Sequence, residues 1–132
     1  MNTRDIEQFC GFPLSDSHVR AIENPSDPIH KSVEILIPEG NESISFFKVN
    51  MAMRELEWKE WTSDHIAFAT HGCGDYFIFD RTRKNKIYYI DPIGTVEESI
   101  AGCEDEGFFF EDFESWYQNE LNDNQSGDDN SE

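Results

Sequence analysis

Three side chains that could support nucleophilic catalysis lie close together in the middle of the chain. His71, Cys73 and Asp75 fall within five residues and supply an imidazole, a thiol and a carboxylate, the groups of a cysteine nucleophile with its base and orienting acid. Gly72 and Gly74 flank the cysteine, and on the tight turn that they favour the three side chains would diverge. Since a free cysteine is usually a small core residue, we expect a turn with a buried Cys73 rather than a catalytic site.

Potential metal ligands are too sparse for a recognisable metal site. A structural zinc site uses paired ligands such as Cys-x₂-Cys, whereas Cys10, His71, Cys73 and Cys103 provide one close pair. Residues 123–132 carry carboxylates without the spaced ligands and central glycine of a calcium-binding loop. The sequence also has no glycine-rich phosphate-binding loop. We therefore expect neither a metal nor a cofactor.

The cysteines and the first residues favour a cytoplasmic protein. The three cysteines are odd in number and far apart, unlike the disulfide framework of a small secreted protein. Residues 1–5 lead into no apolar signal region, and no apolar run is long enough to span a bilayer. We expect reduced thiols and a protein that stays in the cytoplasm.

The charge of the chain is strongly negative and unevenly distributed. The sequence has 28 acidic and 10 basic residues, for a formal net charge of −18. Thirteen of the acids follow Val96, and no lysine or arginine follows Lys86. A field of this sign repels nucleic acids and anionic membranes and attracts cationic proteins. The charge therefore excludes DNA and RNA as expected ligands and favours a basic protein partner.

Five of these acids are candidate partner-binding residues. Expected close to the start of a C-terminal helix, they would be stabilised in part by the positive end of the helix dipole. That effect explains a few acids but not the accumulation of thirteen. Two interpretations of these acids therefore stay as alternatives, a solvated face and a binding surface. The candidates are Glu104, Asp105, Glu106, Glu111 and Asp112.

Two other clusters have simpler explanations. Four basic residues fall within positions 81–86, where solubility of an exposed loop is a sufficient reason. Trp58 and Trp61 are of the type that often anchors a protein interface, but tryptophans near an amphipathic helix are more often part of the core. Neither cluster alone decides a function.

The first half of the chain predicts short helices and one hairpin. Residues 5–9 and 16–22 are typical of short helices, the second with Ser15 as N-cap. Alternating apolar residues at 33–37 and 44–49 on either side of a Pro-Glu-Gly-Asn turn predict a hairpin. Residues 50–61 then return to a helical period.

The second half predicts an antiparallel meander followed by a helix. The runs 66–70, 76–80 and 86–91 are joined by short connectors, which favours antiparallel pairing. Large apolar residues on both alternating sets of the last two runs indicate strands covered on both faces. The C-terminal helix would provide one cover through the stripe Phe110, Phe113, Tyr117 and Leu121.

These elements predict a single α+β domain over residues 1–121. We expect a mostly antiparallel central sheet of about five to six strands flanked by helices, with some mixed pairing left open. Residues 122–132 contain nothing to bury, so ordering them would cost backbone entropy without compensation. They are expected to form an acidic, disordered tail.

The second half also resembles a known family. Its segments together resemble the SUKH superfamily, which includes fungal cell-wall synthesis regulators and many bacterial immunity proteins. The resemblance covers Ile66 to Leu121, and its best points are the Gly74-Asp75 strand opening and the aromatic C-terminal helix. The segments that carry it are Ile66-Ala67-Phe68-Ala69, Gly72 to Asp80, Ile87 to Pro92, and the helix with Phe110 and Phe113.

The resemblance implies a domain that binds a protein and catalyses no reaction. In bacteria the implied partner is a secreted polymorphic toxin, often a nuclease, which agrees with the charge argument because a nuclease site is basic. The expected function is that of an immunity protein, with a regulatory or scaffold module of the cell-wall synthesis regulator type as the alternative. A small cysteine enzyme that uses Cys73 and His71 is the third hypothesis.

Overall fold

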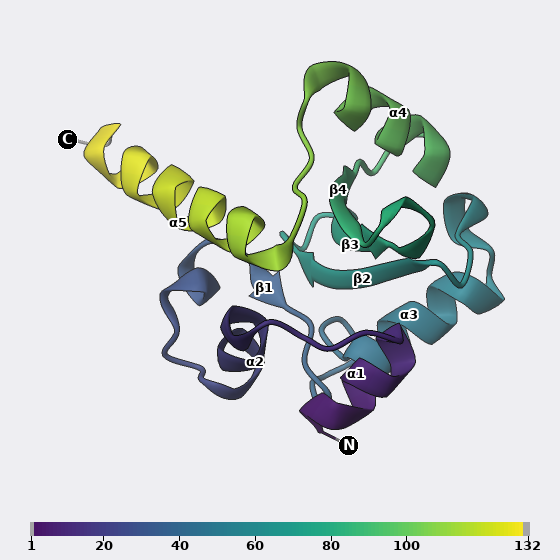
Figure 1. The fold of residues 1–132 in the computed structure, drawn as a ribbon, viewed down its shortest axis with the longest axis horizontal. Helices are drawn as coiled ribbons and strands as arrows, with labels where there is room; N and C mark the ends of the chain where they lie inside the picture. The colour runs from purple at the N-terminus through teal and green to yellow at the C-terminus, as the bar shows by residue number, and fades with distance from the viewer. Residues whose placement is uncertain (1, 131–132) are drawn as a thin grey trace.

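Four antiparallel strands and the helices around them form an α+β fold. A computed structural model describes residues 2–130 (Figure 1). The elements are α1 (Thr3–Cys10), α2 (Asp16–Glu23), the 3₁₀ helix η1 (Pro28–Lys31), β1 (Glu34–Ile35), α3 (Phe46–Glu55), η2 (Trp58–Glu60), β2 (His65–Thr70), β3 (Tyr76–Asp80), η3 (Arg81–Arg83), β4 (Lys86–Ile90), α4 (Val96–Glu106) and α5 (Phe113–Asn130).

The sheet is an antiparallel meander with its strands in sequence order, β1-β2-β3-β4. The predicted runs 66–70, 76–80 and 86–91 correspond to β2, β3 and β4, so this part of the prediction is confirmed. The turn between β2 and β3 contains Gly72 and Gly74, both with a φ of +87°, which a residue with a Cβ adopts only with strain. The two glycines therefore allow the reversal that pairs these strands.

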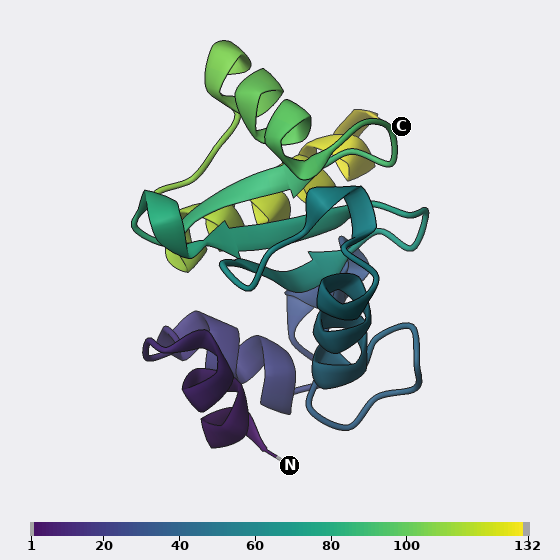
Figure 2. The ribbon, with the colours of Figure 1, turned by 90° about the vertical axis from the view of Figure 1, so that its right-hand side faces the viewer.

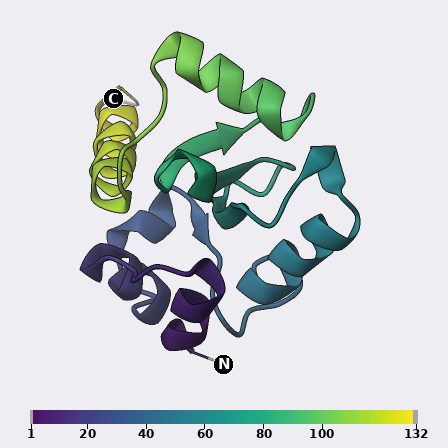
Figure 3. The ribbon, with the colours of Figure 1, turned by 45° about the vertical axis from the view of Figure 1, so that its right-hand side comes forward.

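Helices cover both faces of the sheet, as the alternation of large apolar residues predicts. On one face, Trp116 of α5 packs against Phe68 and Phe77, with ring centroids 4.9 and 5.3 Å away. On the other face, α3 lies against β2 and α4 against β4. Figure 2 shows α3 in front of the sheet and α5 behind it, and Figure 3 shows the helices arranged around the strands.

Helix α5 is joined to the first third of the chain by side-chain hydrogen bonds. The Tyr117 hydroxyl donates to Asp27 over 2.7 Å, and Ser32 donates to the buried Glu120, also over 2.7 Å. Ser17 of α2 donates to Glu114 in the first turn of α5. The C-terminal helix is therefore fixed by partners that precede the sheet in the sequence.

The predicted hairpin is wrong in its second half. Residues 44–49 do not form a strand, because α3 begins at Phe46 with Ser45 as N-cap, whose hydroxyl accepts the backbone N–H of Lys48. A single parallel bridge between Ile37 and Ser45 is what remains of the pairing. Within residues 2–130 the sheet has four strands, fewer than the five to six that the sequence predicts.

The predicted helix over residues 50–61 begins earlier and ends earlier. α3 ends at Glu55, and Glu57, Lys59 and Glu60 then adopt positive φ values of 48°, 54° and 65°, which ends a right-handed helix. The Lys59 ammonium donates to the carbonyl oxygens of Pro92 and Gly94 over 2.5 and 2.7 Å. These bonds hold the irregular segment against the start of α4.

The C-terminal region contains a helix that the sequence reading missed. α4 begins at a capping box formed by Thr95 and Glu98 and ends at Gly107, which has a φ of 70°. α5 begins only at Phe113, so Phe110, which was predicted to belong to the helical stripe, lies before the helix. It pairs instead with Ile87 in an isolated β-bridge.

The end of α5 also differs from the prediction. The helical backbone runs to Asn130 rather than ending near Leu121, since adding a residue to an existing helix is much easier than starting one. The side chains of residues 124–132 lie outside the described residues. The prediction that this tail is solvated falls on these side chains and stays a prediction.

Asn50 of α3 is expected to be a stability determinant. It is fully buried, accepts the Ala67 N–H over 2.8 Å and donates to the carbonyls of Ala67 and Phe46 over 3.0 and 2.9 Å. Asn50→Leu should lower the free energy of unfolding by about 3 kcal/mol, because it leaves buried backbone groups unpaired. Urea unfolding would measure this, with the exposed Lys48→Gln as a control expected to change it by less than about 0.5 kcal/mol. Equal stability of Asn50→Leu and the parent would contradict this role.

Candidate partner-binding surface

The five predicted binding residues occupy two separate places. Glu104, Asp105 and Glu106 form the last turn of α4, whereas Glu111 and Asp112 immediately precede α5. Residues 107–110 separate the two groups, and the connector 107–112 runs from the end of α4 to the start of α5 (Figure 1). The sequence reading placed all five near the start of one helix, and for Glu104, Asp105 and Glu106 that environment is wrong.

The helix dipole opposes the three acids at the end of α4. The C-terminal end of a helix carries partial negative charge, which favours cations, yet the last turn of α4 has no basic residue. Glu104 accepts a hydrogen bond from the buried Tyr88 hydroxyl over 2.6 Å. The side chains of Asp105 and Glu106 are exposed, and their carboxylates make no hydrogen bond or ion pair within the described residues. Fold stability therefore gives no reason for these two carboxylates.

An exposed aromatic ring lies next to these acids. Phe108, 39% exposed, follows the helix-ending Gly107 and packs edge-on against Phe110 at 5.6 Å. Exposed rings beside charges are typical of interface anchors. We name the group Glu104, Asp105, Glu106 and Phe108 the acidic helix end. The sequence reading missed Phe108, although its place directly after a glycine that can end a helix was available as a signal.

The second group has a structural role in part. The Asp112 carboxylate accepts the backbone N–H of Ser115 over 2.8 Å and so caps the start of α5, which agrees with the predicted dipole stabilisation. Glu111 is exposed, and its carboxylate forms no hydrogen bond or ion pair with another described residue. Glu111 and Asp112 both line a cavity of about 240 Å³, and Phe12 and His18 are also part of its wall.

Several other C-terminal acids have partners that the sequence reading did not anticipate. Glu98 completes the cap of α4, and Glu97 pairs with Arg83 over 3.1 Å. Glu114 and Glu120 accept hydrogen bonds from serines early in the chain. The acids without a described partner are therefore a smaller set than the thirteen counted in the sequence.

The basic loop and the tryptophans also have structural roles. Arg83 pairs with the buried Asp80 over 2.5 Å, and Arg81 pairs with Asp64 over 3.3 Å, so solubility alone does not explain this loop. Trp61 is buried, as expected of a core residue, and Trp58 packs against it at 5.9 Å.

His71, Cys73 and Asp75 form a turn whose centre is a buried carboxylate. Contrary to the predicted divergence, His71 Nδ1 lies 2.6 Å from the Asp75 carboxylate, which also accepts the His71 backbone N–H and the Thr70 hydroxyl. Burial opposes ionisation of Asp75, but hydrogen bonds from His71 and Tyr89 hold its pKa below the usual value. Asp75 thus organises the connection between β2 and β3.

Cys73 lies in this turn but is exposed, not buried as predicted. The nearby negative charge of Asp75 is the main cause that raises the pKa of the Cys73 thiol. A catalytic thiol needs the opposite shift, because the thiolate is the nucleophile. The direction of this shift does not support a role for the Cys73 thiol as a nucleophile.

Cys73 is expected to react slowly with alkylating reagents. At pH 8 iodoacetamide should modify one thiol of the folded protein. This reaction should be slower than in an unfolded control, because Asp75 disfavours the thiolate. Intact-mass measurements over time would follow the reaction with iodoacetamide. Cys10 and Cys103 are buried, so Cys73→Ser should remove the reactive thiol. Alkylation faster than in the unfolded control would revive the enzyme hypothesis.

The described residues hold no group of three or more histidine, cysteine, aspartate or glutamate side chains arranged to bind a metal ion. Among the helices of residues 2–130, none has the length and apolarity required to cross a membrane. In comparisons with known proteins, no family model, curated protein or solved structure matches the chain.

Proposed function

We propose that the chain is an immunity protein that neutralises a basic protein toxin, with a nuclease domain as the expected target, by forming a stoichiometric complex. The observation that carries this proposal is the acidic helix end. Asp105 and Glu106 face solvent, have no described partner, and lie where the helix dipole disfavours them. A cationic partner would relieve this unfavourable arrangement.

The charge of the whole chain supports the same class of partner. A nuclease must hold phosphates and therefore presents a positive surface, which a protein of net charge −18 attracts at long range. Binding of an acidic protein at or beside such a surface would exclude the nucleic acid substrate. Phe108 would supply apolar contact next to the charges.

The test is co-expression with the toxin-domain fragment encoded by the adjacent upstream gene. Survival of the cells and isolation of a one-to-one complex are the expected results. Failure of soluble protein to rescue the cells, or the lack of a toxin gene at that position, would contradict the immunity function. A pull-down would then be needed to look for a cellular partner of a regulatory or scaffold module.

A further inference from the structure

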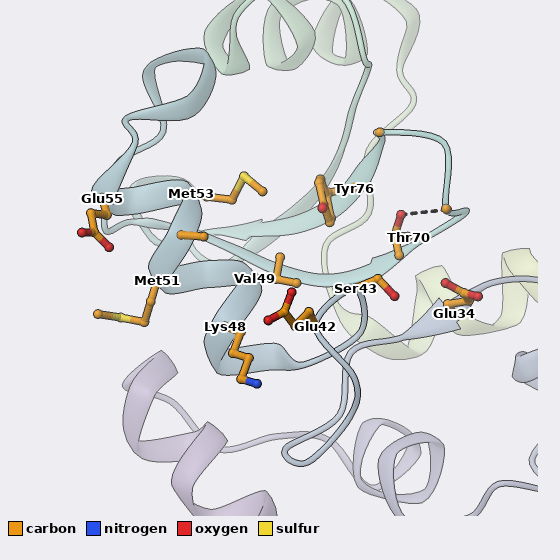
Figure 4. A pocket seen from close by; sticks show the side chains of 13 residues that line it. Glu34, Glu42, Ser43, Lys48, Val49, Met51, Met53, Glu55, Thr70 and Tyr76 are labelled. Atoms are coloured by element: carbon orange, nitrogen blue, oxygen red, sulfur yellow. Dashed lines mark hydrogen bonds between the residues drawn. The ribbon is translucent and has the colours of Figure 1, made fainter.

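A groove opens between α3 and the turn that joins β2 to β3. Its volume is about 740 Å³, and its wall includes the loop that precedes α3 as well as the first residue of β1. Figure 4 shows Met53 of α3 and Tyr76 of β3 facing each other across it. Its lining includes Glu34, Glu42, Lys48, Val49, Met53, Glu55 and Tyr76.

One side of the groove is rigid and the other can adapt. Tyr76 is held edge-on against Trp58 and Trp61, with ring centroids 5.9 and 6.2 Å away. The opposite side has the half-buried Met53 beside Val49. Because a methionine side chain has several rotatable bonds and a polarisable sulfur, it can adjust to apolar groups of different shapes. The groove can therefore accept an apolar side chain without a change in the sheet.

Three carboxylates surround this apolar strip. Glu34, Glu42 and Glu55 are exposed, and within residues 2–130 none of their carboxylates forms a hydrogen bond or an ion pair. Lys48 is the one basic residue in the lining, and its ammonium points away from Tyr76 in Figure 4. The groove thus combines an apolar centre with negative charges that have no partner in the described chain.

We propose that this groove binds an extended basic segment of the partner protein, with an apolar side chain between Met53 and Tyr76 and lysine or arginine side chains at the carboxylates. This inference rests on the proposed function, because charge complementarity selects the cationic partner already inferred for this chain. A second copy of the chain is disfavoured as the occupant by its net charge of −18. The groove lies on α3 and adds a second contact region to the acidic helix end on α4.

The experiment uses two peptides of equal charge as probes. Acetyl-Arg-Leu-Arg-Leu-Arg-amide and its counterpart with glycine in place of leucine are titrated separately into ¹⁵N-labelled protein and followed by NMR. The leucine peptide should shift amide signals of residues 48–55 and 70–76 and bind more tightly than the glycine peptide, because only the former supplies apolar side chains. Equal affinities, or shifts spread over all acidic surfaces, would overturn the inference.

Matched variants separate the groove from general charge attraction. The triple variant Glu34→Gln, Glu42→Gln and Glu55→Gln should weaken binding of the leucine peptide by about tenfold, as expected for three exposed ion pairs. The triple variant Asp16→Asn, Glu23→Gln and Asp123→Asn, at exposed acids of α2 and α5, changes the net charge equally and should weaken it by less than about threefold. Equal losses in the two variants would show diffuse attraction and overturn the groove.

The peptide result and the test of the proposed function can fail separately. If the upstream toxin forms no complex, the immunity function fails whatever the peptides do. If the toxin complex forms and its dissociation rate is unchanged by the groove triple variant, the immunity function stands and the groove inference is overturned. An increase in that dissociation rate, together with peptide shifts at residues 48–55 and 70–76, would support both.

Discussion

Lowering the pH from 7 to 4.5 is expected to remove about 2.5 kcal/mol of stability through His18 alone. This side chain is 1% exposed, stacks on Phe113 at 4.3 Å, and has no hydrogen-bond partner for either ring nitrogen within the described structure. Burial lowers the pKa of His18 from 6.5 to about 3. Between these two values the unfolded chain binds the proton and the folded chain does not, so stability is fully present above pH 6.5 and falls as the pH falls toward 3.

The His18 effect must be separated from the titration of the carboxylates. Protonation of acids relieves the repulsion that a net charge of −18 imposes, which acts in the opposite direction. The measurement is therefore the free energy of unfolding of the parent minus that of His18→Leu, at several pH values. This difference should become less favourable to the parent as the pH falls. A difference independent of pH between 7 and 4.5 would show that His18 does not stay neutral in the fold.

Reversing two charges at the acidic helix end should affect binding and stability in opposite directions. Asp105→Lys with Glu106→Lys is expected to slow association with the toxin domain by about 10- to 100-fold at low salt, because long-range attraction is lost. The same change places cations at the C-terminal end of α4, where the dipole favours them by about 0.3 to 1 kcal/mol each. The double variant keeps Glu104 and its hydrogen bond to Tyr88.

Stopped-flow association at several salt concentrations and urea unfolding would measure the two effects. Asp16→Lys with Glu23→Lys, two exposed acids of α2, is the control with the same change of charge. It should slow association much less, because α2 lies on the opposite side of the molecule from α4 (Figure 1). If the two double variants slow association equally, net charge rather than the acidic helix end governs the encounter.

The sequence predicted the elements whose signals are local. Ser15 caps α2 as expected, and β2 and β3 are joined by a turn that Gly72 and Gly74 permit. The hairpin failed because Ser45, read as part of a strand, caps a helix instead. α4 was not predicted, because its buried apolar residues are few and stand among many acids. They are Val96, Ile100 and Cys103. Its Thr95–Glu98 capping box and Gly107 were present as signals.

The candidate site was predictable in composition but not in placement. The excess of acids after Lys86 drew attention to the segment that contains Asp105 and Glu106, yet their position at a helix end required α4 to be known. The partners of Glu114 and Glu120 are Ser17 and Ser32, which lie 97 and 88 residues away. No local pattern reveals such pairs. The groove beside α3 was likewise not visible, since four separate stretches of the chain, 34, 42–43, 48–55 and 70–76, contribute to it.

The attachment of α5 to the N-terminal third affects the order of events during protein synthesis. Its hydrogen bonds to Ser17, Asp27 and Ser32 join residues separated by 97, 90 and 88 positions. Contacts at such separation form late, because closing a long loop costs entropy before any contact is gained. A nascent chain that has not yet released α5 from the ribosome would expose Phe68 and Phe77, which Trp116 covers in the finished fold. The sheet is therefore covered only after α5 has left the ribosome, and until then the uncovered strands are a substrate for chaperones.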